Sequence, residues 1–285
     1  MVYSLPAGQE EDALNCRAKK TDTERKRVPA MLFTIDIGNT NMVLGGFEGE
    51  EIRFLERLST DQGKTSMEYA LILKNIFEIE GVDPSEVTGA VIASVVPPLT
   101  ASIRKALEKI LSCRVLVVGP GLQTGMGFDV DDPATVGTDL IVAGAAGIRD
   151  YECPLILIDM GTATTISVID ENHNFTGCMI LPGLKVSLNS LTTKTSQLPA
   201  IDLDPPRCLI GKNTVDCMKS GILYGSASML DGMIERIEEE CGRKMTVVAT
   251  GGLSGSIVPL CRHKGIIQDD QLLLRGLRYI YEANA

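Results

Sequence analysis

Two short segments of this chain share one pattern: an apolar run, an aspartate, a glycine, and then residues with hydroxyl or amide side chains. The first contains Asp36 and Gly38, and the second, far downstream, contains Asp159 and Gly161. A glycine in a tight turn lets backbone N–H groups approach an oxyanion, and a nearby carboxylate can organise a cation. One copy alone is more typical of an ordinary hairpin with an Asp in its turn. Two copies, each behind an apolar strand, predict a duplicated fold that holds a nucleotide between its halves.

The first turn has no lysine of the P-loop type, because the chain contains no Gly-x-x-x-x-Gly-Lys-[Ser/Thr] segment. A divalent metal ion would then supply the positive charge. We expect Asp36 to coordinate Mg²⁺, through water, and Gly38 to Asn41 to contact the β- and γ-phosphates. The alternative is that Asp36 only shapes the turn.

A third acid, Asp139, lies in the sequence Gly137-Thr138-Asp139 and opens a run of small residues. Taken alone, this position is typical of a helix N-cap. Combined with two phosphate turns, Asp139 becomes a candidate base, because a carboxylate that accepts the proton of the acceptor hydroxyl is the usual protein contribution to phosphoryl transfer.

Three weaker segments complete the candidates. Thr250-Gly251-Gly252 would let the backbone pack against adenine or ribose, although a plain strand-to-helix turn fits equally well. Lys212-Asn213-Thr214 precedes a predicted helix and would form an anion site at its N-terminus. The hydroxyl-rich residues 192–196 are typical of an exposed loop.

The elements that would position these residues follow from hydrophobic periodicity. In the first half, the predicted strands are 31–35, 42–47, 52–59, 87–95 and 114–118, and the predicted helices are 66–80 and 99–111. The first three strands form an antiparallel meander. Strands followed by alternating helices and strands predict a mixed α/β sheet.

The second half begins like the first, with a strand on each side of its Asp-x-Gly turn. Its predicted elements are a small-residue helix from Asp139, strands at 155–158, 165–170 and 245–250, a helical stretch at 215–242 broken at Gly221 and Gly225, and a final amphipathic helix at 272–280. We therefore expect two mixed-sheet domains, residues 31–147 and 148–285, with a nucleotide cleft between them.

Composition restricts the class of protein. The chain has 285 residues, 44% hydrophobic and 22% charged, which is typical of a globular protein. A net charge of −10 argues against nonspecific nucleic-acid binding, and 4% aromatic residues without Trp argue against reading single strands. No apolar run approaches the ~20 residues of a membrane span. Eight scattered cysteines without a Cys-x-x-Cys pair disfavour a zinc site and favour a reducing, cytoplasmic location.

Residues 1–30 differ from the rest, with an acidic segment at 9–12 and a basic one at 19–27. No apolar segment follows the charges, so a secretory signal is not expected. We interpret residues 1–30 as a disordered tail or as an artefactual upstream extension with Met31 as the natural start. A basic localisation patch is the other reading.

Together the motifs carry a resemblance. The two Asp-x-Gly turns and Thr250-Gly251-Gly252 resemble the superfamily of acetate and sugar kinases, Hsp70 chaperones and actin, which implies a duplicated actin-like, ribonuclease H-like ATPase fold. Within it, the chain is similar to type III pantothenate kinases from Met31 onward. The motifs that carry this likeness are Asp36 to Asn41, Gly137-Thr138-Asp139, Asp159 to Thr165, Pro182-Gly183-Leu184, Leu198-Pro199, Ile210 to Thr214 and Ser220 to Gly225.

The resemblance implies a cytoplasmic homodimer that phosphorylates (R)-pantothenate to 4′-phosphopantothenate, the first step of coenzyme A biosynthesis. It implies ATP with Mg²⁺ and a monovalent cation, K⁺ or NH₄⁺. Asp139 would accept the proton, and Asp159 would bind the monovalent cation. The implied ATP contacts are Asp36, Ile37, Gly38, Asn39, Thr40, Asn41, Met42, Val43 and Thr162, and the implied pantothenate contacts are Gly137, Thr138, Asp139, Leu140 and Thr214.

Two positions depart from the family pattern: Leu140, where many members have Arg, and Val130, where many have Tyr. Both replaced groups are expected substrate contacts, and a lost charged hydrogen bond is typically worth ~1.5–3 kcal/mol. Weaker pantothenate binding, compensation by Lys194 or Lys212, and a different small hydroxy acid as substrate all stay open. A regulatory or accessory protein of the same fold, without turnover, is the alternative from another class. An Hsp70-like ATPase is disfavoured, because the chain leaves little length for a substrate domain.

Overall fold

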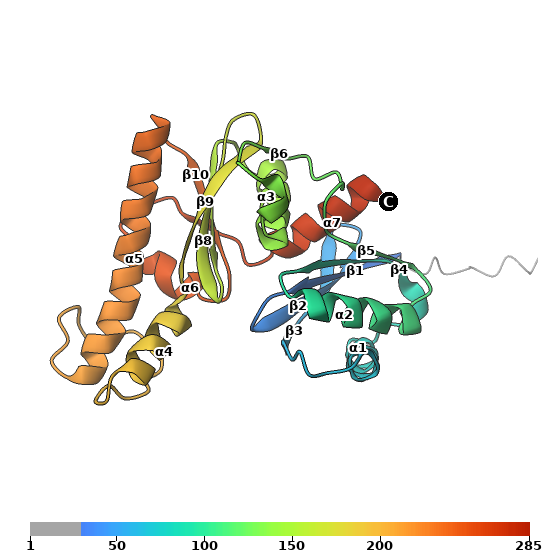
Figure 1. Cartoon of the computed structure of the whole chain (residues 1–285), viewed down its shortest axis with the longest axis horizontal. Coiled ribbons are helices and arrows are strands. Elements are labelled where there is room, and N and C mark those ends of the chain that lie inside the picture. Colours follow the sequence, from blue (N-terminus) through green and yellow to red (C-terminus); the bar gives the residue numbers. More distant parts are fainter. Residues whose placement is uncertain (1–29) are drawn as a thin grey trace, which may run out of the picture.

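The computed structural model describes residues 30–285, so the interpretation of residues 1–30 lies outside the described residues except for Ala30. Two sheets stand side by side with helices between and around them, as Figure 1 shows. One sheet has five strands in the order β3-β2-β1-β4-β5, and the other has six in the order β11-β10-β7-β8-β9-β6.

The five strands of the first sheet agree with the predicted ones to within two residues at each end. They are β1 (Met31–Ile37), β2 (Asn41–Glu48), β3 (Glu51–Ser59), β4 (Val87–Ser94) and β5 (Arg114–Val117). β1, β2 and β3 are antiparallel, whereas β1, β4 and β5 are parallel. This confirms the predicted meander and mixed sheet.

The second sheet repeats the first. Its strands are β6 (Gly127–Phe128), β7 (Leu155–Met160), β8 (Ala163–Ile169), β9 (Asn174–Pro182), β10 (Thr246–Thr250) and β11 (Ile267–Gln268). Read from β9, the order β9-β8-β7-β10-β11 matches β3-β2-β1-β4-β5, with the same antiparallel and parallel pairings. The duplication predicted from the two turns is therefore present in the topology.

Two helices, α3 (Thr138–Asp150) and α7 (Leu272–Asn284), lie between the sheets (Figure 1). Their apolar residues join one core cluster with the first sheet and another with the second. The helices approach closely, because a methyl group on Gly276 of α7 would lie 2.0 Å from the Val142 carbonyl oxygen of α3. The glycines of α3 make room for other neighbours: Gly144 for Met126, and Gly147 for Leu157 of β7.

The outer faces of the sheets are covered by the other helices. α1 (Ser66–Ile79) and α2 (Pro97–Ile110) cover the first sheet, with the short helix η1 (Pro84–Glu86) before β4. α5 (Thr214–Cys241) and α6 (Ser254–Ile257) cover the second sheet, together with α4 (Leu184–Lys194) and η3 (Val258–Leu260). The short helix η2 (Pro133–Thr135) comes directly before α3.

Two predictions were wrong, one for a helix and one for a loop. α5 runs unbroken through Gly221 and Gly225 and ends at Gly242, whose φ of 67° suits a left-handed helix cap. A glycine inside a helix costs only about 1 kcal/mol, which packing of the helix against the sheet outweighs. The hydroxyl-rich segment 192–196 begins inside α4 rather than in a loop, and Thr193 Oγ1 donates to the Asn189 carbonyl at 2.7 Å.

The two halves exchange elements at their border. β6 lies before residue 147 in the chain, yet Phe128 pairs in parallel with Phe175 of β9. α7 lies at the end of the chain, yet it packs on β1 and β4 of the first sheet. Each half therefore contributes to the packing of the other, and this holds the two Asp-x-Gly turns in a fixed relation.

Candidate active site

The first Asp-x-Gly turn connects β1 to β2 and is held by hydrogen bonds from a neighbouring loop. Gly38 N donates to the Asn41 carbonyl at 3.0 Å. Thr60, just after β3, donates its hydroxyl to the Gly38 carbonyl at 2.6 Å and its amide to the Thr40 carbonyl at 2.9 Å. Within residues 30–285, the amides of Asn39 and Thr40 donate to no backbone carbonyl. Those two N–H groups are free to bind an anion.

The second turn connects β7 to β8 and touches the first. Thr40 Oγ1 and Thr162 Oγ1 form a hydrogen bond of 2.7 Å between the two halves of the chain. Gly183 N donates to the Thr162 carbonyl at 3.1 Å, and a methyl group on Gly183 would lie 2.3 Å from that oxygen. Glycine is therefore required where the end of β9 approaches the turn. The predicted pair of phosphate turns is brought together.

Asp139 occupies the second residue of α3, so the alternative interpretation of Asp139 as a helix N-cap was wrong. Gly137 is the N-cap, and the Asp139 carboxylate accepts a hydrogen bond from Leu140 N at 3.0 Å. The start of α3 is fixed to the first sheet, because Thr138 Oγ1 donates to the Ser94 carbonyl at 2.9 Å. This contact directs the first turn of α3 to the carboxyl ends of β1 and β4.

Asp36, Asp139 and Asp159, which we call the acid cluster, lie close enough to repel one another. Burial, followed by the charges of Asp159 and Asp139, raises the pKa of Asp36 to about 7. Burial, followed by the charge of Asp139, raises the pKa of Asp159 to about 6. Burial also raises the pKa of Asp139. All three side chains keep partial exposure, so the cluster is open to a ligand and short of positive charge.

The surroundings of Asp159 suit an oxygen-liganded cation. Thr250 at the end of β10 pairs in register with Asp159, and its hydroxyl is buried without a hydrogen-bond partner among the described residues. The next residue, Gly251, has φ 91°, and a methyl group there would lie 2.6 Å from Asp159 Oδ1. A carboxylate beside an unpartnered hydroxyl fits the hard-oxygen ligation of alkali and alkaline-earth cations.

Side chains of the described residues alone do not form a complete metal-binding site. Within residues 30–285, no group of three or more His, Cys, Asp and Glu side chains is placed to hold a metal ion. Mg²⁺ in nucleotide sites typically takes one or two carboxylates, with water and phosphate oxygens as its other ligands. Asp36 beside the two phosphate turns fits that partial role.

Thr214 is not brought to the acid cluster. It begins α5, on the outer side of the second sheet next to α4 and away from α3 (Figure 1). The N-terminus of α5 already holds an acidic side chain: Asp216 accepts from Asn213 Nδ2 and pairs with Arg207, each at 2.8 Å. Lys194 and Lys212 belong to the same outer region.

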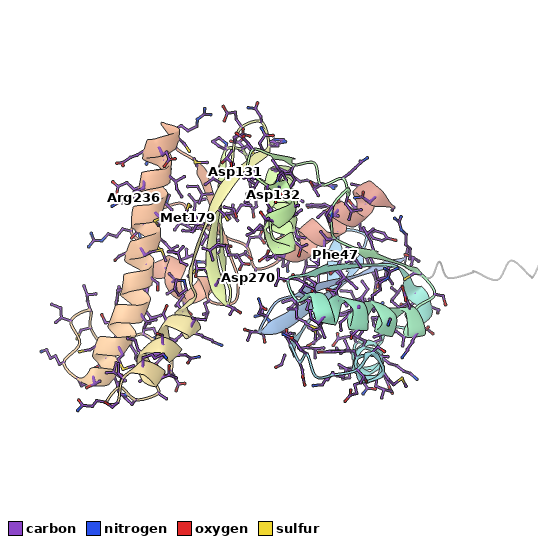
Figure 2. All side chains as sticks on the ribbon, in the orientation of Figure 1. Phe47, Asp131, Asp132, Met179, Arg236 and Asp270 are labelled. Carbon is purple, nitrogen blue, oxygen red and sulfur yellow. The ribbon has the colours of Figure 1, made fainter. Side chains whose placement is uncertain are left out.

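The two departures from the family pattern share one apolar environment. Leu140 is buried with Met126 and Ala143 between α3 and the second sheet, and the partly buried Val130 packs on the same cluster. Asp131 and Asp132, labelled in Figure 2, follow Val130 on the segment between β6 and α3. The region beside Asp139 is thus apolar at both positions.

Sequence reasoning did not single out Thr60 or Ser94, although they position the first turn and α3. Their contacts join residues 22 and 44 positions apart in the chain. No local pattern marks such residues, since a threonine after a strand and a serine before a proline pair are common. Only the fold identifies them.

Comparison with known proteins decides the family. The model of the family described as type III pantothenate kinase matches residues 32–236. The chain belongs to the type III pantothenate kinase family. A type III pantothenate kinase of Brevibacillus brevis is 41% identical over 256 residues, which cover 89% of this chain and 99% of that protein.

Solved structures agree on the fold. A conserved protein of Campylobacter jejuni, described as a putative Baf family transcriptional activator, superposes with a TM-score of 0.56 at 18% identity, covering 88% of this chain and 98% of that one. MreB 5 of Spiroplasma citri bound to AMPPNP superposes with a TM-score of 0.51 at 10% identity, covering 89% and 96%. The duplicated actin-like ATPase fold is therefore confirmed.

Family membership settles the activity. The protein phosphorylates pantothenate in coenzyme A biosynthesis, as the family resemblance implied. A kinase with this ATPase fold uses ATP and a divalent metal ion. Within residues 30–285, no helix combines the length and the apolar composition needed to cross a bilayer.

Proposed function

We propose that the transfer takes place where the acid cluster meets the two phosphate turns, with Asp139 as the residue that accepts the proton of the pantothenate hydroxyl. The observation that supports this is the convergence of three carboxylates from β1, β7 and α3. Burial raises the pKa of all three, and the charge of Asp139 also raises the pKa of Asp36 and of Asp159. Such an arrangement is costly unless cations and a reacting hydroxyl occupy it.

The ATP phosphates bind along Asp36 to Val43 and at Thr162 in this proposal. The free amides of Asn39 and Thr40 and the two threonine hydroxyls are the groups that can donate to phosphate oxygens. Ile37 and Met42 are buried in the core, so their contribution is made by the backbone. Mg²⁺, held through water by Asp36, would neutralise charge on the β- and γ-phosphates.

Asp139 and Asp159 have different tasks. A carboxylate of raised pKa holds a proton better than an ordinary one, so Asp139 can take the proton as the hydroxyl oxygen bonds to phosphorus. Asp159, with Thr250, binds K⁺ or NH₄⁺ and thereby keeps the cluster ionised. Pantothenate lies along Gly137 to Leu140, where Leu140 and Val130 supply apolar packing beneath the site in place of polar contacts.

The enzyme acts as a cytoplasmic homodimer in this proposal. Several apolar side chains of the second half are exposed: Ile180 of β9 is 71% exposed, and Leu209 and Ile210 before α5 are 59% and 81% exposed. A second copy would cover them. It would also explain why Thr214 lies far from Asp139 within one chain, since a partner could supply it.

The test is a kinase assay with ATP, Mg²⁺ and pantothenate against a panel of small hydroxy acids, run in K⁺ and in Na⁺. We expect 4′-phosphopantothenate as the main product and a sharp loss of rate in Na⁺. Binding of ATP without product from pantothenate would contradict the assigned substrate. An equal rate in both salts would contradict the role of Asp159, and an Asp159→Asn variant that keeps its K⁺ dependence would do the same.

A further inference from the structure

We propose that Arg57 of β3 binds the phosphate chain of the nucleotide from the side opposite the phosphate turns. This inference rests on the proposed function, because it requires a nucleotide between the two halves. It assigns a role to a residue that no motif singled out.

Arg57 shares a sheet face with Asp36. Asp36 pairs in register with Val43 of β2, and Val43 pairs with Arg57 of β3. Residues directly opposite each other in a sheet project to the same face, and neighbouring strands lie about 4.8 Å apart. The Arg57 backbone is thus about 10 Å from that of Asp36, near enough for both side chains to bind the same extended ligand.

The guanidinium of Arg57 reaches the second half of the chain. A methyl group on Gly252, in the turn that follows β10, would lie 2.8 Å from Arg57 Nη1. The preceding residue of that turn, Gly251, packs against Asp159. Glycine at position 252 therefore makes room for an arginine from the opposite sheet, and Arg57 spans the two halves beside the acid cluster.

Within residues 30–285, Arg57 has no ionic partner, although that part of the chain contains many acidic residues. Its residue is exposed, and the described part of the chain places no carboxylate within 4.0 Å of it. Arg53 on the same strand behaves differently, since it pairs with Glu48 at 2.6 Å and with Glu86 at 3.2 Å. A free guanidinium held against the opposite half suits a phosphate, which its planar donors can bind in bidentate fashion.

Calorimetric binding of Mg·ADP, together with competition by adenosine, tests this role in the full-length protein. We expect Arg57→Gln to weaken Mg·ADP binding 10- to 100-fold, which is typical for one charged hydrogen-bonding group, and to leave adenosine competition within twofold. The Mg·ADP affinity of Arg57→Lys should lie between that of the wild type and that of Arg57→Gln. Arg53→Gln, the matched control on β3, should bind Mg·ADP like the wild type. In turnover, the KM for ATP should rise while the KM for pantothenate stays constant.

Two results would overturn the inference and leave the nucleotide site intact: wild-type affinity of Arg57→Gln for Mg·ADP, or an equal loss for Mg·ADP and adenosine. A thermal midpoint of Arg57→Gln near that of the wild type ensures that neither result comes from unfolding. A wild-type protein that binds no Mg·ADP would instead overturn the proposed nucleotide site itself. The two failures are therefore distinguishable.

Discussion

At the scale of single residues, the acid cluster is the feature that most needs a functional explanation. Buried carboxylates normally have a cationic or hydrogen-bonding partner. Asp159 and Asp36 have neither a salt bridge within residues 30–285 nor an ordinary pKa, and Asp139 has only a backbone amide. Their arrangement favours cation binding over the stability of the ligand-free protein.

Asp36→Asn should therefore stabilise the enzyme when nucleotide and divalent metal are absent. The pKa of Asp36 is about 7 in the folded state against 3.8 for an ordinary aspartate. Folding then favours the protonated form, so its stabilising contribution is complete below pH 3.8 and is lost as the pH rises through about 7. At pH 8 the variant should gain about 2 kcal/mol in the free energy of unfolding, less than the full shift implies because water reaches the site.

Urea unfolding in EDTA at pH 5 and pH 8 measures this gain, which should be smaller at pH 5. Asp202→Asn, at an exposed position, is the control and should change little. An Asp36→Asn protein no more stable than the wild type at pH 8 would show that Asp36 is not an uncompensated charge.

The residues of the acid cluster could be predicted from sequence because each belongs to a local pattern. Asp36 and Asp159 stand before the glycine of a turn, and Asp139 stands at the start of a small-residue helix. The unpartnered hydroxyl of Thr250 and the free guanidinium of Arg57 could not. Both depend on which strand lies beside which: Thr250 is next to Asp159 only through the pairing of β10 with β7. Sequence spacing carries no information on that contact.

At the scale of elements, the two β-hairpin turns act as one unit because Thr40 and Thr162 join them across the halves. Valine keeps the shape of threonine and removes the hydroxyl. We expect Thr40→Val and Thr162→Val each to weaken Mg·ADP binding, and the double variant to lose less than the sum of the two, with a coupling of about 0.5–1 kcal/mol.

Calorimetry on the four proteins of this cycle gives the coupling directly. Thr176→Val on β9 is the control, since its hydroxyl donates within the second sheet to the Val168 carbonyl at 3.3 Å. Strictly additive losses would mean that the two turns bind the nucleotide independently.

Elements with strong periodicity or apolar runs were predictable, and the others were not. The five strands of the first sheet each have an apolar core and a turn residue at one end. β9 has Gly177 in its interior and ends at Pro182, and both residue types are uncommon in strands, so its strand signal in the sequence is weak. β6 and β11 are two residues long and exist only because a neighbouring strand offers hydrogen bonds.

At the scale of the whole molecule, the layered arrangement places α3 and α7 between two sheets and leaves an apolar surface on the second half. We expect a native mass near twice the 30.6 kDa of one chain. Ile180→Lys combined with Ile210→Lys should shift sedimentation to the monomer, because buried lysines would lose hydration at the interface. Ile79→Lys on α1, at a position 79% exposed, is the control and should stay dimeric. A wild type that sediments as a monomer at micromolar concentration would refute the dimer.

The most direct test of the account is the turnover of Asp139→Asn with saturating ATP, Mg²⁺, K⁺ and pantothenate. Asparagine keeps the size and the hydrogen bond to Leu140 N but cannot accept the hydroxyl proton. We predict a kcat at least 100-fold below the wild type, as expected for loss of a general base, with Mg·ADP affinity within twofold. A kcat within tenfold of the wild type would contradict the central role of Asp139.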